Sequence, residues 1–155
     1  MTDAIIEAYW QDFLKTQPPD SPYHGRSYIA DHFGDNPAPA DELAALVLSG
    51  VKTGTCSALR EWEAEGNPIP EAGLISIILS GDGSPICILE TTEVTLCRFD
   101  EVDEDFARSE GEGDLSLAYW RDAHKRYFSR TLPKIGKQFT DDMPLVCERF
   151  QVIHK

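Results

Sequence analysis

The sequence predicts an α+β fold, a small mixed β-barrel surrounded by peripheral helices. One observation is a hairpin, in which the apolar run 74–79 is followed by the turn residues 81–84 and a long second strand, 86–99. A second is that helical segments are inserted between strands without a repeating βαβ order. A last strand, 145–153, alternates apolar and polar residues, and closing such strands into a barrel leaves few exposed edges.

The chain begins with a predicted helix over 2–16, because apolar residues recur there at helical spacing. These are Ile5, Ile6, Tyr9, Trp10, Phe13 and Leu14. Pro18-Pro19 ends this helix. Residues 18–39 are rich in Pro, Gly, Asp and Asn and are predicted to form a long irregular loop anchored by aromatic side chains, either functional or disordered.

Four further helices are predicted. The first spans 42–48, with Asp41 as its N-cap and Gly50 as the left-handed residue after its end. A short charged helix covers 59–65, and two more cover 99–108 and 114–130. The last of these places Leu117, Trp120 and His124 on one face and is ended by Pro133.

Length and composition favour one domain over residues 1–155, with 1–22 as an N-terminal helix and linker to the barrel core. The four cysteines form no CxxC pair, and the histidines are scattered, so we expect neither a metal nor another cofactor. With no signal peptide or membrane-spanning run recognised, we expect a cytoplasmic protein with reduced thiols and no membrane partner.

The net charge of −13 argues against binding long polyanions, and no DNA partner is expected. Six of the fourteen basic residues nevertheless fall between Arg121 and Lys137, after an acidic stretch from Asp100 to Asp114. Such a basic segment suits a small anionic ligand or a short stretch of RNA. The sequence leaves the oligomeric state open.

Two segments carry candidate chemistry: 49–57, which contains Lys52 among small and hydroxyl residues, and 107–114, which contains Glu110. Together they offer a Lys/Thr/Glu hydrolytic site or a pocket that holds a nucleotide. Lys52 and Thr55 point to opposite faces of an ideal strand, so their joint action requires an irregular backbone at Gly54.

Several blocks of the chain, in order, resemble the ASCH domain family. They are residues 42–55, 94–99, 106–121 and 143–150, and the likeness covers about residues 23–153. The resemblance implies a PUA-like β-barrel with a cleft between barrel and helices, in a superfamily associated with RNA.

Similar family members have been assigned two activities. One removes an acyl group from the exocyclic amine of cytidine-type nucleosides without a metal, and the other cleaves single-stranded RNA. The residues of the amidohydrolase type map onto Lys52, Thr55 and Glu110. Two departures from the family pattern affect the expected substrate range. Gly54 stands where a bulkier residue would be unsurprising, and the chain is longer than the shortest amidohydrolases of the family.

The resemblance and the residue chemistry together suggest further binding residues: Thr53, Ser57, Glu112, Ser116, Tyr119, Trp120, Arg121, Lys125, Tyr23 and Arg26. Each has a simpler interpretation. The aromatic residues suit a core, the basic residues a solvated patch, and Lys52 and Glu110 solvated charges; Glu112 could also replace Glu110.

Whether Lys52 is neutral or charged is not fixed by the sequence. A neutral lysine could act as a base, whereas a charged one would polarise a carbonyl and leave Glu110 as the base. Because the net charge of −13 favours a small substrate over a long polyanion, we rank amide hydrolysis of acylated cytidine-type nucleosides first. The alternative is a single-stranded RNA-binding module with ribonuclease activity.

Overall fold

A computed structural model describes residues 2–31 and 37–155. Their contacts divide the chain into two compact units. The first unit is 1–50, 73–91 and 150–155, and the second is 51–72 and 92–149. Two long strands, β4 (Pro85–Arg98) and β5 (Pro144–His154), contribute residues to both units. The prediction of a single domain over 1–155 stays a prediction.

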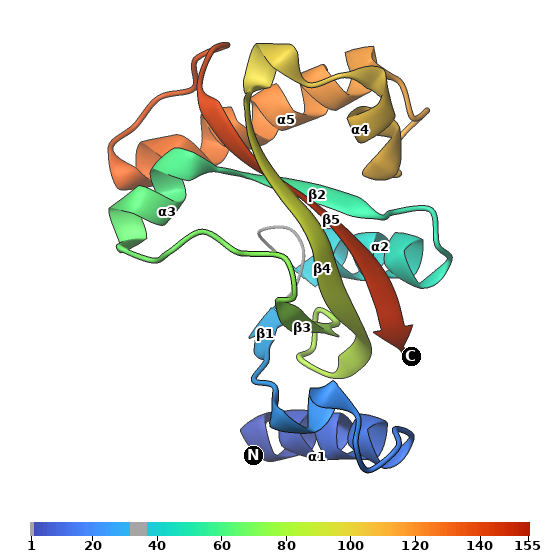
Figure 1. Cartoon of the computed structure of the whole chain (residues 1–155). Coiled ribbons are helices and arrows are strands. Elements are labelled where there is room, and N and C mark those ends of the chain that lie inside the picture. Colours follow the sequence, from blue (N-terminus) through green and yellow to red (C-terminus); the bar gives the residue numbers. More distant parts are fainter. Residues whose placement is uncertain (1, 32–36) are drawn as a thin grey trace. The chain divides into compact units, whose positions relative to one another are not determined.

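The sheet is mixed and has five strands in the order β1-β3-β4-β5-β2 (Figure 1). β1 (Ile29–Asp31) runs parallel to β3 (Ile75–Leu79), and β3 runs antiparallel to β4. β2 (Gly54–Ala58) runs antiparallel to β5. The predicted class, α+β built on a small mixed barrel-like sheet, is confirmed, as is the hairpin of β3 and β4.

The first unit contains α1 (Thr2–Lys15), the 3₁₀ turn η1 (Pro22–Gly25) and α2 (Pro37–Leu48). The apolar stripe of α1 packs on β3 and β4, with Phe13 only 1% exposed. A second cluster joins Ala44 and Val47 of α2 to Cys87 and Leu89 of β4. The helix predicted over 2–16 is thus confirmed, and burial of its stripe accounts for its docking.

Two expectations for this unit are wrong. Asp41 is not an N-cap, because α2 begins at Pro37; its carboxylate instead accepts a hydrogen bond of 2.7 Å from the backbone N–H of Gly81. The segment 18–39 is not wholly irregular, because it contains η1 and β1, which are too short to leave a periodic pattern. Part of the predicted loop, residues 32–36, lies outside the described residues.

The second unit contains the helices α3 (Leu59–Glu65), α4 (Glu104–Ser109) and α5 (Leu117–Thr131) and the 3₁₀ turns η2 (Phe99–Glu101) and η3 (Leu132–Ile135). The helix predicted over 99–108 is therefore wrong in its first half. Asp103 caps α4 by accepting a hydrogen bond from the N–H of Phe106, so the helix starts there. Ser116 caps α5 in the same way, which shortens the helix predicted over 114–130.

The core of the second unit is one apolar cluster that includes Phe106 of α4, Trp120 and Phe128 of α5 and Leu145 of β5. α4 contacts both β2 and α5. The end of α4 therefore lies beside the start of β2, where Lys52 precedes the strand. None of the helices in residues 2–31 and 37–155 combines the length and the apolar character that a membrane-spanning segment needs.

Candidate active site

The close approach of residues 51–54 to the end of α4 brings the two predicted segments together. The backbone N–H of Thr53 donates a hydrogen bond of 2.6 Å to the carbonyl of Ser109. A Cβ at Gly54 would lie 2.4 Å from Oγ of Ser109, and a Cβ at Gly111 would lie 2.7 Å from the carbonyl oxygen of Val51. Glycine at both positions is what allows two backbones to lie this close.

Lys52 and Glu110 form a buried ion pair within this contact. Nζ of Lys52 lies 3.2 Å from Oε1 of Glu110 and 3.3 Å from the carbonyl oxygen of the same residue. Both side chains are only 2% exposed. Oε2 of Glu112 lies 3.5 Å from the same ammonium, and this carboxylate is 28% exposed. The sequence-predicted convergence of Lys52 with Glu110 is thus present, and Glu112 joins it.

Two residues of α5 complete the environment of Glu110. The indole N–H of Trp120 donates a hydrogen bond of 2.6 Å to Oε2, and Nε2 of His124 lies 3.3 Å from the same oxygen. The two rings stack with centroids 4.2 Å apart. Their spacing of four residues places both on one face of α5.

The charges around Glu110 keep it ionised. Burial alone would raise its pKa, but the positive charge of Lys52, followed by His124 and the Trp120 hydrogen bond, outweighs burial and lowers the pKa to about 2. For His124, burial would lower the pKa, and the carboxylate of Glu110 raises it above its ordinary value. A carboxylate with so low a pKa is a weak base near neutral pH.

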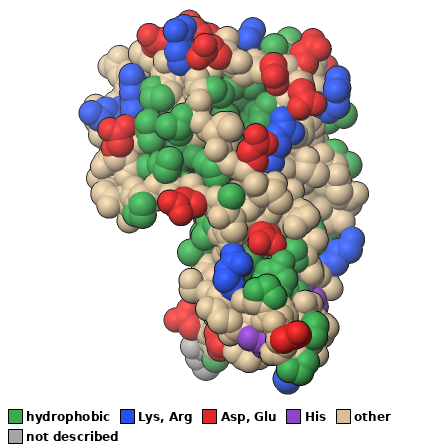
Figure 2. Space-filling view, in the orientation of Figure 1, with side chains coloured by type: hydrophobic (Ala, Val, Ile, Leu, Met, Phe, Trp, Pro, Cys, Tyr) green, Lys and Arg blue, Asp and Glu red, His purple; other side chains and the backbone are tan. Residues whose placement is uncertain are grey.

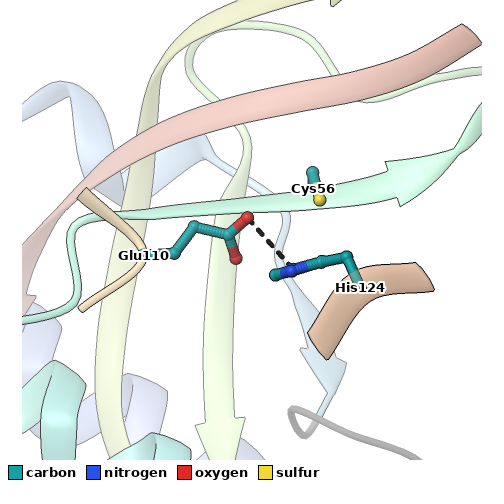
Figure 3. A group of neighbouring side chains, drawn as sticks. All are labelled: Cys56, Glu110 and His124. Carbon is teal, nitrogen blue, oxygen red and sulfur yellow. Dashed lines mark ion pairs between the residues drawn. The ribbon is translucent and has the colours of Figure 1, made fainter. Parts of the chain in front are cut away.

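Cys56 of β2 also lies near Glu110, and Figure 3 shows its thiol with the Glu110 carboxylate and the His124 ring. Burial, and then the charge of Glu110, raise the pKa of this thiol well above its ordinary value. A neutral thiol is a poor nucleophile, so the arrangement does not favour Cys56 as an attacking group.

Thr55 lies on the other face of β2. The strand pairs with β5 in continuous register, from Gly54 opposite Arg149 to Ala58 opposite Leu145. Successive side chains of such a strand point to opposite faces, so Thr55 and Cys56 diverge. The irregular backbone predicted at Gly54 is therefore wrong; this glycine serves the close approach to Ser109 instead.

Most other predicted binding residues have local structural partners. Oγ of Ser57 accepts a hydrogen bond from the indole of Trp62, and Ser116 is the cap of α5. Arg121 donates to backbone carbonyls of Asp100 and Val102, and Lys125 lies over the ring of Phe139.

The predicted binding residues also include three aromatic residues and Arg26, which differ in exposure and in their partners. Trp120 is 2% exposed, which leaves no open ring face for a base, whereas Tyr119 is 40% exposed and covers Gly113. In the first unit, the hydroxyl of Tyr23 donates to Glu90, and Arg26 donates to the carbonyl of Gly73.

Sequence reasoning missed His124 and Cys56 as members of the site. The position of His124 four residues after Trp120 was the available signal, because it put both on one helical face. Cys56 shares the face of Gly54 because β2 is regular, whereas Thr55 had been chosen through the family resemblance.

Comparisons with a family model and with solved structures agree on the kind of domain that this chain resembles. The family model described as the ASCH domain matches residues 29–154. The crystal structure of an ASCH domain from Lactobacillus crispatus JV V101 is 36% identical, with a TM-score of 0.89 over 99% of this chain and 94% of that one. A crystal structure of a protein from Enterococcus faecalis V583 is also 36% identical, with a TM-score of 0.86 over 99% and 90% of the respective chains. No curated protein matches the chain.

Proposed function

The chain belongs to the ASCH domain family, and we propose that it is a hydrolase of RNA-type small molecules. Its substrate is a cytidine-type nucleoside acylated on the exocyclic amine, and its reaction is cleavage of that amide bond. The observation that carries this proposal is the buried pair of Lys52 and Glu110, with Nζ and Oε1 3.2 Å apart.

In the proposed reaction Lys52 supplies positive charge. Its ammonium lies between the carboxylates of Glu110 and Glu112, which hold it in position. A fixed ammonium stabilises the negative charge that develops on a carbonyl oxygen during attack, and such stabilisation is often the largest contribution to catalysis. Glu110, with its pKa lowered to about 2, orients Lys52 and does not accept the proton.

Glu112 is the better candidate for proton transfer. Its carboxylate is 28% exposed, compared with 2% for Glu110, and lies 3.5 Å from Lys52. A partly exposed carboxylate can accept a proton from an attacking water beside the ammonium and pass it to the exocyclic nitrogen as the C–N bond breaks, which yields the free nucleoside and a carboxylic acid. We take water as the nucleophile, because Thr55 lies on the face of β2 opposite Cys56 and the regular strand does not turn its hydroxyl toward Glu110.

The charge distribution supports a small substrate. The chain carries a net charge of −13, and acidic and basic side chains are interspersed on the face shown in Figure 2. A phosphate backbone is held by many lysine and arginine contacts, whereas an acylated nucleoside requires none. The charge distribution therefore favours a nucleoside over an RNA strand as the substrate.

The experiment is acyl release from 4-acetylcytidine, followed by the change in ultraviolet absorption, with and without a chelator. We expect release by the wild type in both conditions and a loss of at least about 100-fold in kcat/KM for Lys52→Met. Lys15→Met is the matched control, because it removes the same charge from a side chain at the end of α1 that is 78% exposed. Its kcat/KM should stay close to that of the wild type.

Two further measurements separate the alternatives. If Thr55→Val loses as much activity as Lys52→Met, the hydroxyl is the nucleophile; if it retains activity, water is. Cleavage of a labelled single-stranded RNA without any acyl release would reject the proposal in favour of ribonuclease action.

A further inference from the structure

We propose that Cys56, Glu110 and His124 form a binding site for a thiophilic divalent cation, of which zinc is the natural example. The three residues come from β2, the end of α4 and α5, and Figure 3 shows their side chains gathered around one point. One ligand atom from each, the thiol sulfur, a carboxylate oxygen and an imidazole nitrogen, lies within 4.8 Å of the other two.

The donor set fits zinc. Sulfur, imidazole nitrogen and carboxylate oxygen are the three atom types that zinc takes from proteins, and open zinc sites have three protein ligands with one position for water or another molecule. Ligand atoms about 2.1 Å from a tetrahedral ion are about 3.4 Å apart. Nε2 of His124 and Oε2 of Glu110 are already 3.3 Å apart, so this pair needs little movement.

The imidazole of His124 is oriented as a metal ligand requires. Its Nδ1 lies 2.8 Å from the carbonyl oxygen of Trp120, and since a carbonyl only accepts, Nδ1 carries the hydrogen. The other nitrogen, Nε2, then faces Glu110 and Cys56. Fixing one nitrogen through a backbone carbonyl is the usual arrangement around metal-binding histidines.

Glu110 is held by a neighbour in a similar way. The Trp120 indole donates to Oε2, and such hydrogen bonds to a ligating carboxylate fix its orientation. Oε1 points instead to Lys52, whose ammonium also has Glu112 3.5 Å away. The lysine therefore keeps a carboxylate partner when Glu110 turns toward a cation.

Two of the three residues, Cys56 and His124, are partly exposed, with the His124 side chain 13% exposed, whereas Glu110 is 2% exposed. Solvent therefore reaches the site at these two residues more than at Glu110. On binding, the thiol gives its proton to solvent and the sulfur forms the metal bond as a thiolate.

Binding at this site has a consequence that depends on the proposed function. A cation that recruits Glu110 weakens the pair between Glu110 and Lys52, which we propose to be catalytic. Zinc is therefore expected to inhibit a hydrolase that itself needs no metal, and the chelator should restore its activity.

The direct test is titration with Co²⁺, whose bonds to thiolate sulfur give an intense near-ultraviolet absorption. We expect one cobalt per wild-type chain with this absorption. Cys56→Ser should lose the absorption, and His124→Gln should bind cobalt at least about 10-fold more weakly. Cys97→Ser is the matched control, because Cys97 is also partly exposed and its sulfur lies 3.3 Å from that of Cys147.

Several outcomes would overturn the site. One is thiolate absorption that persists in Cys56→Ser or disappears in Cys97→Ser; another is wild-type affinity in His124→Gln. If a variant does not fold, X-ray absorption of the zinc-loaded wild type decides, since one sulfur with nitrogen and oxygen neighbours is expected and an absence of sulfur rejects the site.

Cobalt binding is measured without substrate, so the two proposals can fail separately. Thiolate absorption at Cys56 in a protein that releases no acyl group rejects the proposed function and leaves the metal site in place. Acyl release by a protein that shows no thiolate absorption rejects the metal site and leaves the proposed function in place.

Discussion

The indole N–H of Trp120 donates a hydrogen bond of 2.6 Å to Oε2 of Glu110. This contact joins the middle of the apolar core to the charged pair of the candidate site, because the same ring lies in the cluster with Phe106 and Phe128. The carboxylate is only 2% exposed and depends on such donors in place of water. The core and the site are therefore coupled through one side chain.

Removing this donor should destabilise the protein more than removing a comparable one elsewhere. Trp120→Phe leaves a buried carboxylate short of one hydrogen bond, and we expect a loss of about 2–4 kcal/mol in the free energy of unfolding. Trp62→Phe removes the same group from a partly buried ring that donates to Oγ of Ser57, and about 1 kcal/mol is expected. Urea unfolding measures both; equal losses would contradict the coupling.

The buried pair should be costly to break from one side. Glu110→Gln leaves the ammonium of Lys52 buried with a weaker set of partners, and we expect a loss of about 3–5 kcal/mol. Glu112→Gln, at a carboxylate that is 28% exposed, should cost less than about 1 kcal/mol.

The double variant Lys52→Met with Glu110→Gln is the test of the pairing itself. It removes both charges, so its loss of stability should be smaller than the sum of the two single losses. Additive losses would mean that the two side chains do not interact in solution.

Ionisation of Glu110 predicts a stability change in acid. Its pKa is lowered from 4.5 to about 2 in the folded protein, so the folded state gains stability that is fully present above the unfolded value of about 4.5. That contribution, on the order of 3 kcal/mol, is lost as the pH falls toward 2. The difference in unfolding free energy between wild type and Glu110→Gln, measured from pH 6 to pH 2, isolates it from other carboxylates. A constant difference would show that Glu110 is not stabilised as an anion.

His124 should act in the opposite direction. Despite burial, the charge of Glu110 raises its pKa above 6.5, so protonation stabilises the fold below about pH 6.5. This stability is lost as the pH rises through the folded pKa. Nuclear magnetic resonance of the imidazole should show its midpoint above that of a free histidine, and in His124→Gln the decline of stability over that range should disappear. A midpoint below 6.5 would mean that burial outweighs Glu110.

The sequence predicted those parts of the fold that depend on local patterns. Alternating apolar residues and the Gly81–Ser84 turn predicted the hairpin, and the apolar stripe predicted α1. The predicted start of α2 was wrong, and so was the first half of the helix predicted over 99–108, where capping at Asp103 decided the boundary. A helix boundary depends on which residue caps it, and apolar periodicity alone does not identify that residue.

The candidate site was only partly predictable for a similar reason. Lys52 and Glu110 were found through motifs, and the structure brings them together, but the choice of Thr55, made from the family resemblance, required a bulge at Gly54 that β2 does not have. The glycine is explained by a contact 55 residues away, at Ser109, which no local pattern reveals. Cys56 and His124 were missed because their convergence depends on the docking of α5 against β2.

Gly111 offers the sharpest test of how Lys52 is held. Its φ is 72°, and an added Cβ would lie 2.7 Å from the carbonyl oxygen of Val51 and 2.9 Å from the backbone nitrogen of Lys52. Gly66 has a φ of 70° but nothing within 4 Å of such a Cβ, so Gly66→Ala measures the backbone strain alone, about 1–2 kcal/mol. Gly111→Ala adds a clash with backbone that cannot rotate away, and we expect a further 1–3 kcal/mol, about the cost of overpacking.

The same change should also disturb the position of Lys52. Relief of the clash moves residues 51–52 away from the end of α4 and lengthens the pair with Glu110, so acyl release should fall in Gly111→Ala and remain near wild type in Gly66→Ala. Thermal unfolding and kcat/KM for 4-acetylcytidine, measured on both variants, check the two effects. Equal melting temperatures and equal activities would show that the approach of these two backbones does not hold Lys52 in place.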